Sequence, residues 1–130
     1  MLPDHPVIQY WSLIRDGLTC LGVDSDSILV LADMMRDAGF HNVTTEIFHI
    51  PIGTWPKNDI LKTVGRCWRT ILLDGVQPIA LRPLTRGLKW SREQVEVRLV
   101  EVRKAYMDDW VHSHMPLYII CGQKPEGMGM

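Results

Sequence analysis

The sequence has neither a long apolar run nor a strongly basic stretch. No segment approaches the roughly 20 consecutive apolar residues that a membrane helix needs, and the N-terminus lacks the pattern of a secretion signal. Basic and acidic residues are interleaved, with a net charge of −1, so no segment predicts binding to a phosphate backbone. We therefore expect a soluble, cytoplasmic protein that binds neither membranes nor nucleic acid.

Cysteine is scarce, and its spacing excludes several kinds of site. Cys20, Cys67 and Cys121 form no CxxC pair and no Cys/His ligand pattern, so no metal site is expected. An odd number of cysteines does not suit a disulfide framework. We expect three free, buried thiols in a reducing compartment. A phosphate-binding glycine loop and a Ser/His/Asp order are also absent, so the residues themselves predict no bound cofactor.

Length and composition predict one domain. A chain of 130 residues with 46% hydrophobic content can bury one ordinary core. We assign residues 1–125 to this domain and residues 126–130, which end in GMGM, to a flexible tail.

Apolar periodicity and capping residues predict about five helices. Pro6 suits the first helical position, and Ser91–Gln94 (SREQ) forms a capping box. Gly39 suits a left-handed helix end, whereas Pro78 and Pro83 should make the fourth helix irregular. The expected ranges are Pro6–Leu21, Ser25 or Ser27 to Ala38, Asn58 or Asp59 to Leu73, an irregular helix from Gly75, and Ser91 to about Tyr106.

Two segments predict strands. Val43–Ile50 is rich in β-branched and aromatic residues and is followed by Pro51 and Gly53. The second strand is Leu117–Gln123, whose apolar run from Leu117 to Cys121 is typical of a strand covered on both faces. The expected order is helix, helix, strand, three helices, strand.

Three motifs carry a resemblance that covers nearly the whole chain. They are IPIGTWPK, LTRGLKWSREQVEV and a final strand that ends in GQKP. Together they resemble the C-terminal half of fungal class I methyltransferases related to the velvet-associated regulator of secondary metabolism. The resemblance implies a truncated Rossmann-like α/β fold with two antiparallel strands and about five helices. The family's S-adenosylmethionine site follows a glycine-rich turn, and no GxGxG occurs here, so we expect no cofactor and no methyl transfer by the isolated chain.

The resemblance also implies an open strand edge. In the family fold, the strand at 117–123 would lie antiparallel to the one at 43–50 and would pair on its other side with a strand not found here. An unpaired edge favours pairing with another chain. We expect a twofold homodimer through residues 117–123, with a methyltransferase-like partner as the competing arrangement.

Aromatic, histidine and arginine side chains are the candidates for a small-molecule site. Five tryptophans, including Trp110, are many for this length, and aromatic walls are typical of such pockets. Two histidines spaced by two can act as acid and base near neutral pH, and arginines beside an aromatic wall can hold a carboxylate or carbonyl. Core packing or a solvated helix face is the alternative for each. The catalytic candidates are His112, His114 and Arg66; the substrate-binding candidates are Tyr10, Trp11, Trp55, Trp68, Arg69 and Arg86.

Two functions are compatible with these features. The first is a cofactor-independent cyclase or isomerase of fungal secondary metabolism, such as a Diels–Alderase, which holds a reactive substrate in one conformer. The second is a non-catalytic accessory subunit of a full-length methyltransferase. An apolar cavity lined by Trp11, Trp55, Arg66 and His112 would favour the enzyme.

Overall fold

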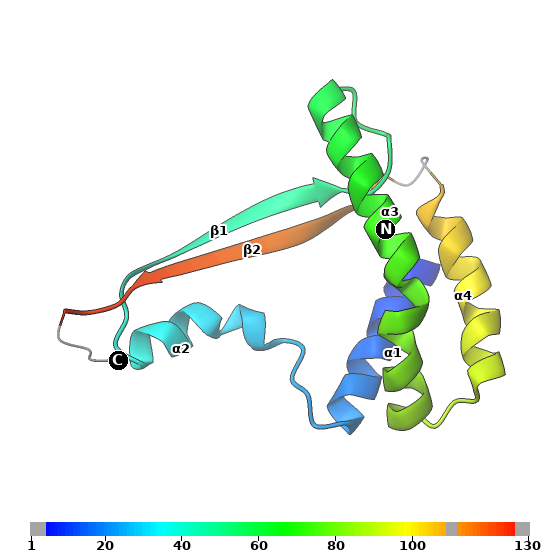
Figure 1. Ribbon diagram of the computed structural model, residues 1–130, viewed down its shortest axis with the longest axis horizontal. Helices are drawn as coiled ribbons and strands as arrows, with labels where there is room; N and C mark the ends of the chain where they lie inside the picture. The colour runs from blue at the N-terminus through cyan, green and yellow to red at the C-terminus, as the bar shows by residue number, and fades with distance from the viewer. Residues whose placement is uncertain (1–4, 109–111, 127–130) are drawn as a thin grey trace. The chain divides into compact units, whose positions relative to one another are not determined.

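Figure 1 shows the computed structural model, which describes residues 5–108 and 112–126. The α/β composition with two antiparallel strands confirms the predicted fold class. The chain divides into unit 1 (Met1–Asp24 and Ile50–Met115) and unit 2 (Ser25–His49 and Pro116–Met130). The elements are α1 (Pro6–Cys20), a 3-10 turn η1 (Ser27–Leu29), α2 (Leu31–Asp37), β1 (His41–Pro51), α3 (Asp59–Arg82), a π-helical turn η2 (Pro83–Gly87), α4 (Arg92–Tyr106) and β2 (His114–Gln123).

The single domain proposed for residues 1–125 stays a prediction. The proposed tail, 126–130, lies outside the described residues except for Glu126, and so does Trp110.

Helix ends follow the signals in the sequence. Asn58 caps α3 by accepting hydrogen bonds from the backbone N–H groups of Ile60 and Leu61. Ser91 and Gln94 form the predicted capping box at the start of α4, with both reciprocal bonds present. Gly22 and Gly39 have φ angles of 80° and 102°, the left-handed conformation that ends a helix at low cost when the residue is glycine.

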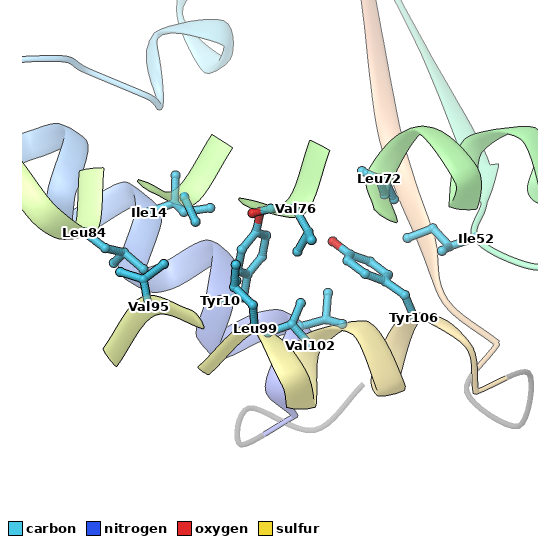
Figure 2. Close-up of a cluster of buried hydrophobic side chains, with 12 residues drawn as sticks. Tyr10, Ile14, Ile52, Leu72, Val76, Leu84, Val95, Leu99, Val102 and Tyr106 are labelled. Atoms are coloured by element: carbon cyan, nitrogen blue, oxygen red, sulfur yellow. The ribbon is translucent and has the colours of Figure 1, made fainter. Parts of the chain in front are cut away.

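The core of unit 1 is built from one face each of α1, α3 and α4 (Figure 2). The face of α4 is the predicted one, since Val95, Leu99, Val102 and Tyr106 are all buried. Burying one such side chain contributes about 1.5–3 kcal/mol, so these helices are held mainly by packing. The remaining buried hydrophobic residues are Val7, Tyr10, Ile14, Ile52, Leu72, Val76, Ala80 and Leu84.

Helix α3 is longer than predicted. It continues through Gly75 and Pro78 to Arg82, so the expected end at Leu73 and the separate fourth helix are wrong. Leu72, Val76 and Ala80 recur every four residues and are all buried. Because this apolar face stays in phase across Gly75, tertiary packing outweighs the local cost of glycine and proline.

Unit 2 holds η1, α2 and most of the two strands. None of its described residues is buried. The predicted second helix is divided into η1 and α2, and no side chain of Ser25 or Ser27 caps either of them. The sheet has two strands in the described part of the chain (Figure 1).

The strand register follows from two hydrogen bonds. The side-chain nitrogen of Asn42 donates to Gln123 Oε1 at 2.9 Å, and the N–H of Ile52 donates to the carbonyl of Ser113 at 3.0 Å. Both fit one antiparallel register in which paired residue numbers have a constant sum. Phe48 therefore lies opposite Leu117, and Glu46 opposite Ile119.

Two predictions about burial are wrong. Cys20, Cys67 and Cys121 are free thiols, but all three are exposed. Cys20 is the last residue of α1, and Cys67 lies on an exposed face of α3. Cys121 lies on β2, which pairs only with β1 in the described part of the chain. Leu117 and Ile119, expected in a strand covered on both faces, are 39% and 43% exposed.

Candidate functional site

The loop that follows β1 places Trp55 against His112. Their rings stack at 4.8 Å between centroids, with 7° between the planes. The indole nitrogen of Trp55 donates a hydrogen bond to the carbonyl of Ser113 at 3.0 Å. This bond fixes the indole, and the exposed imidazole of His112 rests on its face. Two of the predicted site residues, 57 positions apart, are thus brought together.

Close backbone contacts hold this loop. The N–H of Gly53 donates to the carbonyl of Gly65 on α3 at 3.1 Å. A Cβ on Gly65 would collide with the carbonyl oxygen of Gly53, so only glycine lets the helix and the loop approach this closely. Gly53 itself has a φ of 102°. The two glycines set the position of Trp55 relative to α3.

One face of α3 therefore lies beside the loop. Trp68 and Arg69 follow Gly65 by three and four residues, so they share its face. Trp68 is half-buried, and its indole nitrogen is buried without a hydrogen-bond partner among the described residues. A buried donor left unpaired costs about 1–3 kcal/mol.

The other two catalytic candidates lie nearby in the fold. Arg66 is exposed and follows Gly65 directly, so it points about 100° around α3 from that face. His114 is the exposed first residue of β2, two residues after His112. Among the described residues, no hydrogen bond joins the side chain of Arg66 to His112. Their catalytic roles stay predictions.

Tyr10 and Trp11 belong to the core of unit 1. The hydroxyl of Tyr10 donates to the carbonyl of Val76 at 2.8 Å, and the indole of Trp11 donates to the hydroxyl of Tyr106 at 3.1 Å. The rings of Tyr10 and Trp11 meet edge to face, 5.1 Å apart. These contacts anchor α1 to α3 and α4. Core packing therefore accounts for the positions of Tyr10 and Trp11, and no bound substrate is needed to explain them.

Burial changes the acidity of both tyrosines. Burial raises the pKa of Tyr106 to about 12, although the hydrogen bond from Trp11 opposes the shift. Burial, followed by the nearby Tyr106, also raises the pKa of Tyr10 well above its usual range, and Arg103 opposes that shift. Both hydroxyls therefore remain protonated at neutral pH.

Two described surface cavities lie elsewhere in unit 1. One of about 420 Å³ follows α4 and is lined by Trp90, Glu93, Gln94, Val97, Arg98 and Glu101. The other, of about 290 Å³, is lined by Pro78, Leu81, Arg82, Thr85 and Arg86. Arg86 is the one predicted site residue among them, and together with Arg82 it gives the second cavity two cations, which suit an anionic group. Neither cavity includes Trp11, Trp55, Arg66 or His112.

The chemistry available at the Trp55–His112 site is proton exchange beside an aromatic wall. His112 supplies a group that donates or accepts a proton, and Trp55 supplies an apolar surface. Within residues 5–108 and 112–126, no three His, Cys, Asp or Glu side chains cluster as metal ligands would. In the same ranges, no helix is long and apolar enough to cross a membrane.

Sequence reasoning missed Gly65 and Ser113. The available signal was a glycine inside a strong helix pattern, which indicates a close backbone approach. The carbonyl of Ser113 leaves no trace in the sequence, because every residue has one.

Comparison with known proteins confirms the resemblance. A methyltransferase from Aspergillus terreus, pytC, is 31% identical over 105 residues, which cover 81% of this chain and 32% of that protein. A probable methyltransferase from Emericella nidulans, tdiE, is 26% identical over 97% of this chain and 40% of its own length. The secondary metabolism regulator laeA of Monascus pilosus is 24% identical over 70% of this chain and 25% of its own.

The chain thus spans about a third of the length of the curated relatives it matches. No family profile matches the sequence. No solved structure matches it either.

Proposed function

Because this chain belongs with the fungal secondary-metabolism methyltransferases, we propose that it acts on a small molecule of such a pathway without a methyl donor. The proposed reaction is a cofactor-independent cyclisation or isomerisation. Its site is the loop of Trp55 together with His112 and the adjoining face of α3.

The absence of a glycine-rich turn supports the proposal that no methyl donor binds to these residues. A GxGxG turn between a strand and a helix grips the cofactor in Rossmann-like folds, and this sequence contains none. The proposed reaction therefore uses only groups that this chain supplies.

The stacked Trp55–His112 pair is the observation that carries the proposal. An indole fixed by its bond to Ser113 gives a rigid apolar wall, which favours one folded conformer of a flexible substrate. His112 donates a hydrogen bond to a substrate carbonyl, which lowers the barrier when charge builds on that oxygen.

The atoms of the proposed reaction balance within one molecule. A carbon–carbon bond forms while π bonds shift, and no group leaves or enters. Any proton that His112 gives is returned to it by the end of the cycle. The product is therefore an isomer of its precursor.

Deletion of the gene from its producer, followed by mass spectrometry of metabolites, tests this function. The deletion strain should accumulate an uncyclised compound with the same molecular formula as the lost product. Complementation with His112→Gln should lower product formation by about 10²-fold or more, the usual contribution of an acid–base group. The matched control is His41→Gln, because His41 is an exposed histidine of unit 2.

The accessory-subunit function has its own supporting observation. Exposed apolar residues recur along α3, and the most exposed, Ile60, has 74% of its surface accessible. An exposed apolar stripe indicates contact with another protein. The stripe consists of Ile60, Val64, Ile71 and Ile79.

The same metabolite experiment separates the two functions. An accessory subunit predicts that the deletion strain accumulates a compound that lacks a methyl group, instead of an isomer. Activity that survives His112→Gln but is lost with Ile71→Lys would also favour the subunit and contradict the enzyme.

A further inference from the structure

Within residues 5–108 and 112–126, no strand pairs with the edge of β2 that faces away from β1. In the antiparallel register, the bond from Ile52 to Ser113 makes the odd-numbered residues of β2 bond to β1. The N–H and C=O groups of Tyr118 and Ile120 therefore point outward. Pro116, which has no N–H, also falls on an outward position. The missing N–H therefore removes no hydrogen bond between β1 and β2.

The edge of β1 is better protected than that of β2. Val43 falls on an outward position of β1, and its carbonyl accepts a hydrogen bond from Arg36 of α2 at 3.4 Å. The same end of the sheet is covered on one face, because a Cβ on Gly122 would lie 2.7 Å from the Met35 side chain and 3.2 Å from Phe40. Among the described residues, no side-chain hydrogen bond like that of Arg36 reaches the outward backbone groups of Tyr118 or Ile120.

The sheet face that carries Ile119 is exposed in the part of the chain that the structure describes. Residues of β2 alternate between faces, so Leu117 and Ile119 share a face with Phe48, their near neighbour on β1. These three are 39%, 43% and 46% exposed. A two-stranded hairpin is at best marginally stable in water, and unit 2 has no buried residue of its own to compensate.

We infer that the outward edge of β2 pairs with the same edge of a second copy of this chain, antiparallel and around a twofold axis at Ile119. The result is a continuous four-stranded sheet. Its central strands are the two copies of β2, and the outward N–H and C=O groups of Tyr118 and Ile120 pair across the axis. This inference does not rest on the proposed function.

Charge and symmetry favour a second copy as the occupant. Residues 115–123 contain no charged side chain, so the segment can face itself without like-charge repulsion. Ile119 is at the centre of residues 115–123. A twofold axis at Ile119 therefore places this whole segment opposite the same segment of the second copy. Leu117 then lies opposite Cys121, and Tyr118 opposite Ile120. The interface is isologous, because the same residues of both copies form it.

A cysteine cross-link tests the register. At a non-hydrogen-bonded antiparallel pair, the Cα atoms are about 4.5 Å apart, within the disulfide range. We expect Ile119→Cys, with Cys20, Cys67 and Cys121 changed to serine, to form a disulfide-linked dimer on mild oxidation. Thr45→Cys in the same background is the control, since it lies on β1, and should stay uncross-linked.

A charge on the axis tests the interface by light scattering. The wild-type chain should have the mass of two 14.9 kDa chains, and Ile119→Lys should reduce it to one. Val97→Lys, a change at an exposed residue of α4, should remain dimeric. Circular dichroism checks that each variant is folded, and the cross-link decides the matter if Ile119→Lys does not fold.

Three results would overturn the inference. One is the mass of a single chain at the highest soluble concentration together with no cross-link. Another is a dimer that persists in Ile119→Lys, because the interface would then lie elsewhere. The third is a chain that is monomeric alone and cross-links through residue 119 only to a methyltransferase-like partner.

Discussion

Two indole nitrogens in the same unit differ in a way that stability measurements can detect. The N–H of Trp11 donates to the hydroxyl of Tyr106, whereas the N–H of Trp68 is buried without a partner among the described residues. A satisfied hydrogen bond contributes about 1 kcal/mol, and an unsatisfied buried donor costs at least as much. The two residues therefore suit a paired comparison.

We expect Trp11→Phe to lower the free energy of unfolding by about 1 kcal/mol more than Trp68→Phe. Trp11→Phe removes apolar area and a hydrogen bond that stabilises the folded state. Trp68→Phe removes apolar area and a buried, unpaired donor that destabilises it. Urea unfolding of the three proteins measures the difference. An equal or larger loss in Trp68→Phe would mean that its indole has a partner in the folded protein.

The buried tyrosines predict instability in alkali. The pKa of Tyr106 is raised to about 12 and that of Tyr10 is raised further, whereas both hydroxyls ionise near pH 10 in the unfolded chain. Above pH 10 the unfolded state therefore loses protons that the folded state keeps. The stabilising effect is complete below pH 10 and is lost as the pH rises toward 12, by up to about 1.4 kcal/mol per tyrosine and pH unit.

Urea unfolding across this alkaline range measures the loss. Tyr10→Phe should show a shallower decline than the wild-type chain, because one of the two titrating groups is gone. A free energy of unfolding that does not change between about pH 9 and pH 11 would contradict the burial of both hydroxyls.

At the scale of elements, close backbone approaches fix the helix packing of unit 1. A Cβ on Gly17 of α1 would collide with the carbonyl of Pro83 in η2. Gly87 approaches the carbonyl of Gly17 in the same way. The α1–η2 contact therefore depends on glycine at both positions, although glycine weakens a helix interior.

Gly17→Ala should lower the free energy of unfolding by about 1–3 kcal/mol, because overpacking outweighs the better helix propensity of alanine. Gly75→Ala is the matched control. Its Cβ would meet only the flexible end of Ile79, at 3.1 Å, so we expect no loss and a gain of up to about 1 kcal/mol. Thermal unfolding of both variants measures this. A harmless Gly17→Ala would show that α1 and η2 do not approach so closely.

Local signals in the sequence predicted the starts of α3 and α4 and the glycine ends at Gly22 and Gly39, but not a cap for α2 or the end of α3. The caps at Asn58 and Ser91 and the left-handed glycines act within one helical turn, so a few adjacent residues determine them. The continuity of α3 across Gly75 and Pro78 depends on packing of Leu72, Val76 and Ala80 against other helices. Such packing outweighs local propensity and cannot be derived from the segment alone.

The candidate site was predictable in its members but not in its geometry. Trp55 and His112 were singled out by residue type and by the resemblance. Their stacking depends on the Gly53–Gly65 contact and on the carbonyl of Ser113, which long-range chain paths determine. Arg86 lies instead beside a separate cavity.

For the whole molecule, the decisive feature is the contrast between the two units. Unit 1 holds all the buried hydrophobic residues, whereas the described residues of unit 2 include none. Three-stranded or larger sheets gain stability that two strands lack. A second copy paired at the outward edge of β2 makes four strands from two.

The most direct test of this pairing is amide hydrogen exchange at β2. The outward N–H groups of Tyr118 and Ile120 should exchange slowly in the wild-type chain and fast in Ile119→Lys, because pairing with a second copy protects them. The outward N–H groups of Thr45 and Ile47 on β1 serve as the internal reference. Amides of Tyr118 and Ile120 that exchange as fast as those of Thr45 and Ile47 in the wild-type chain would contradict the account.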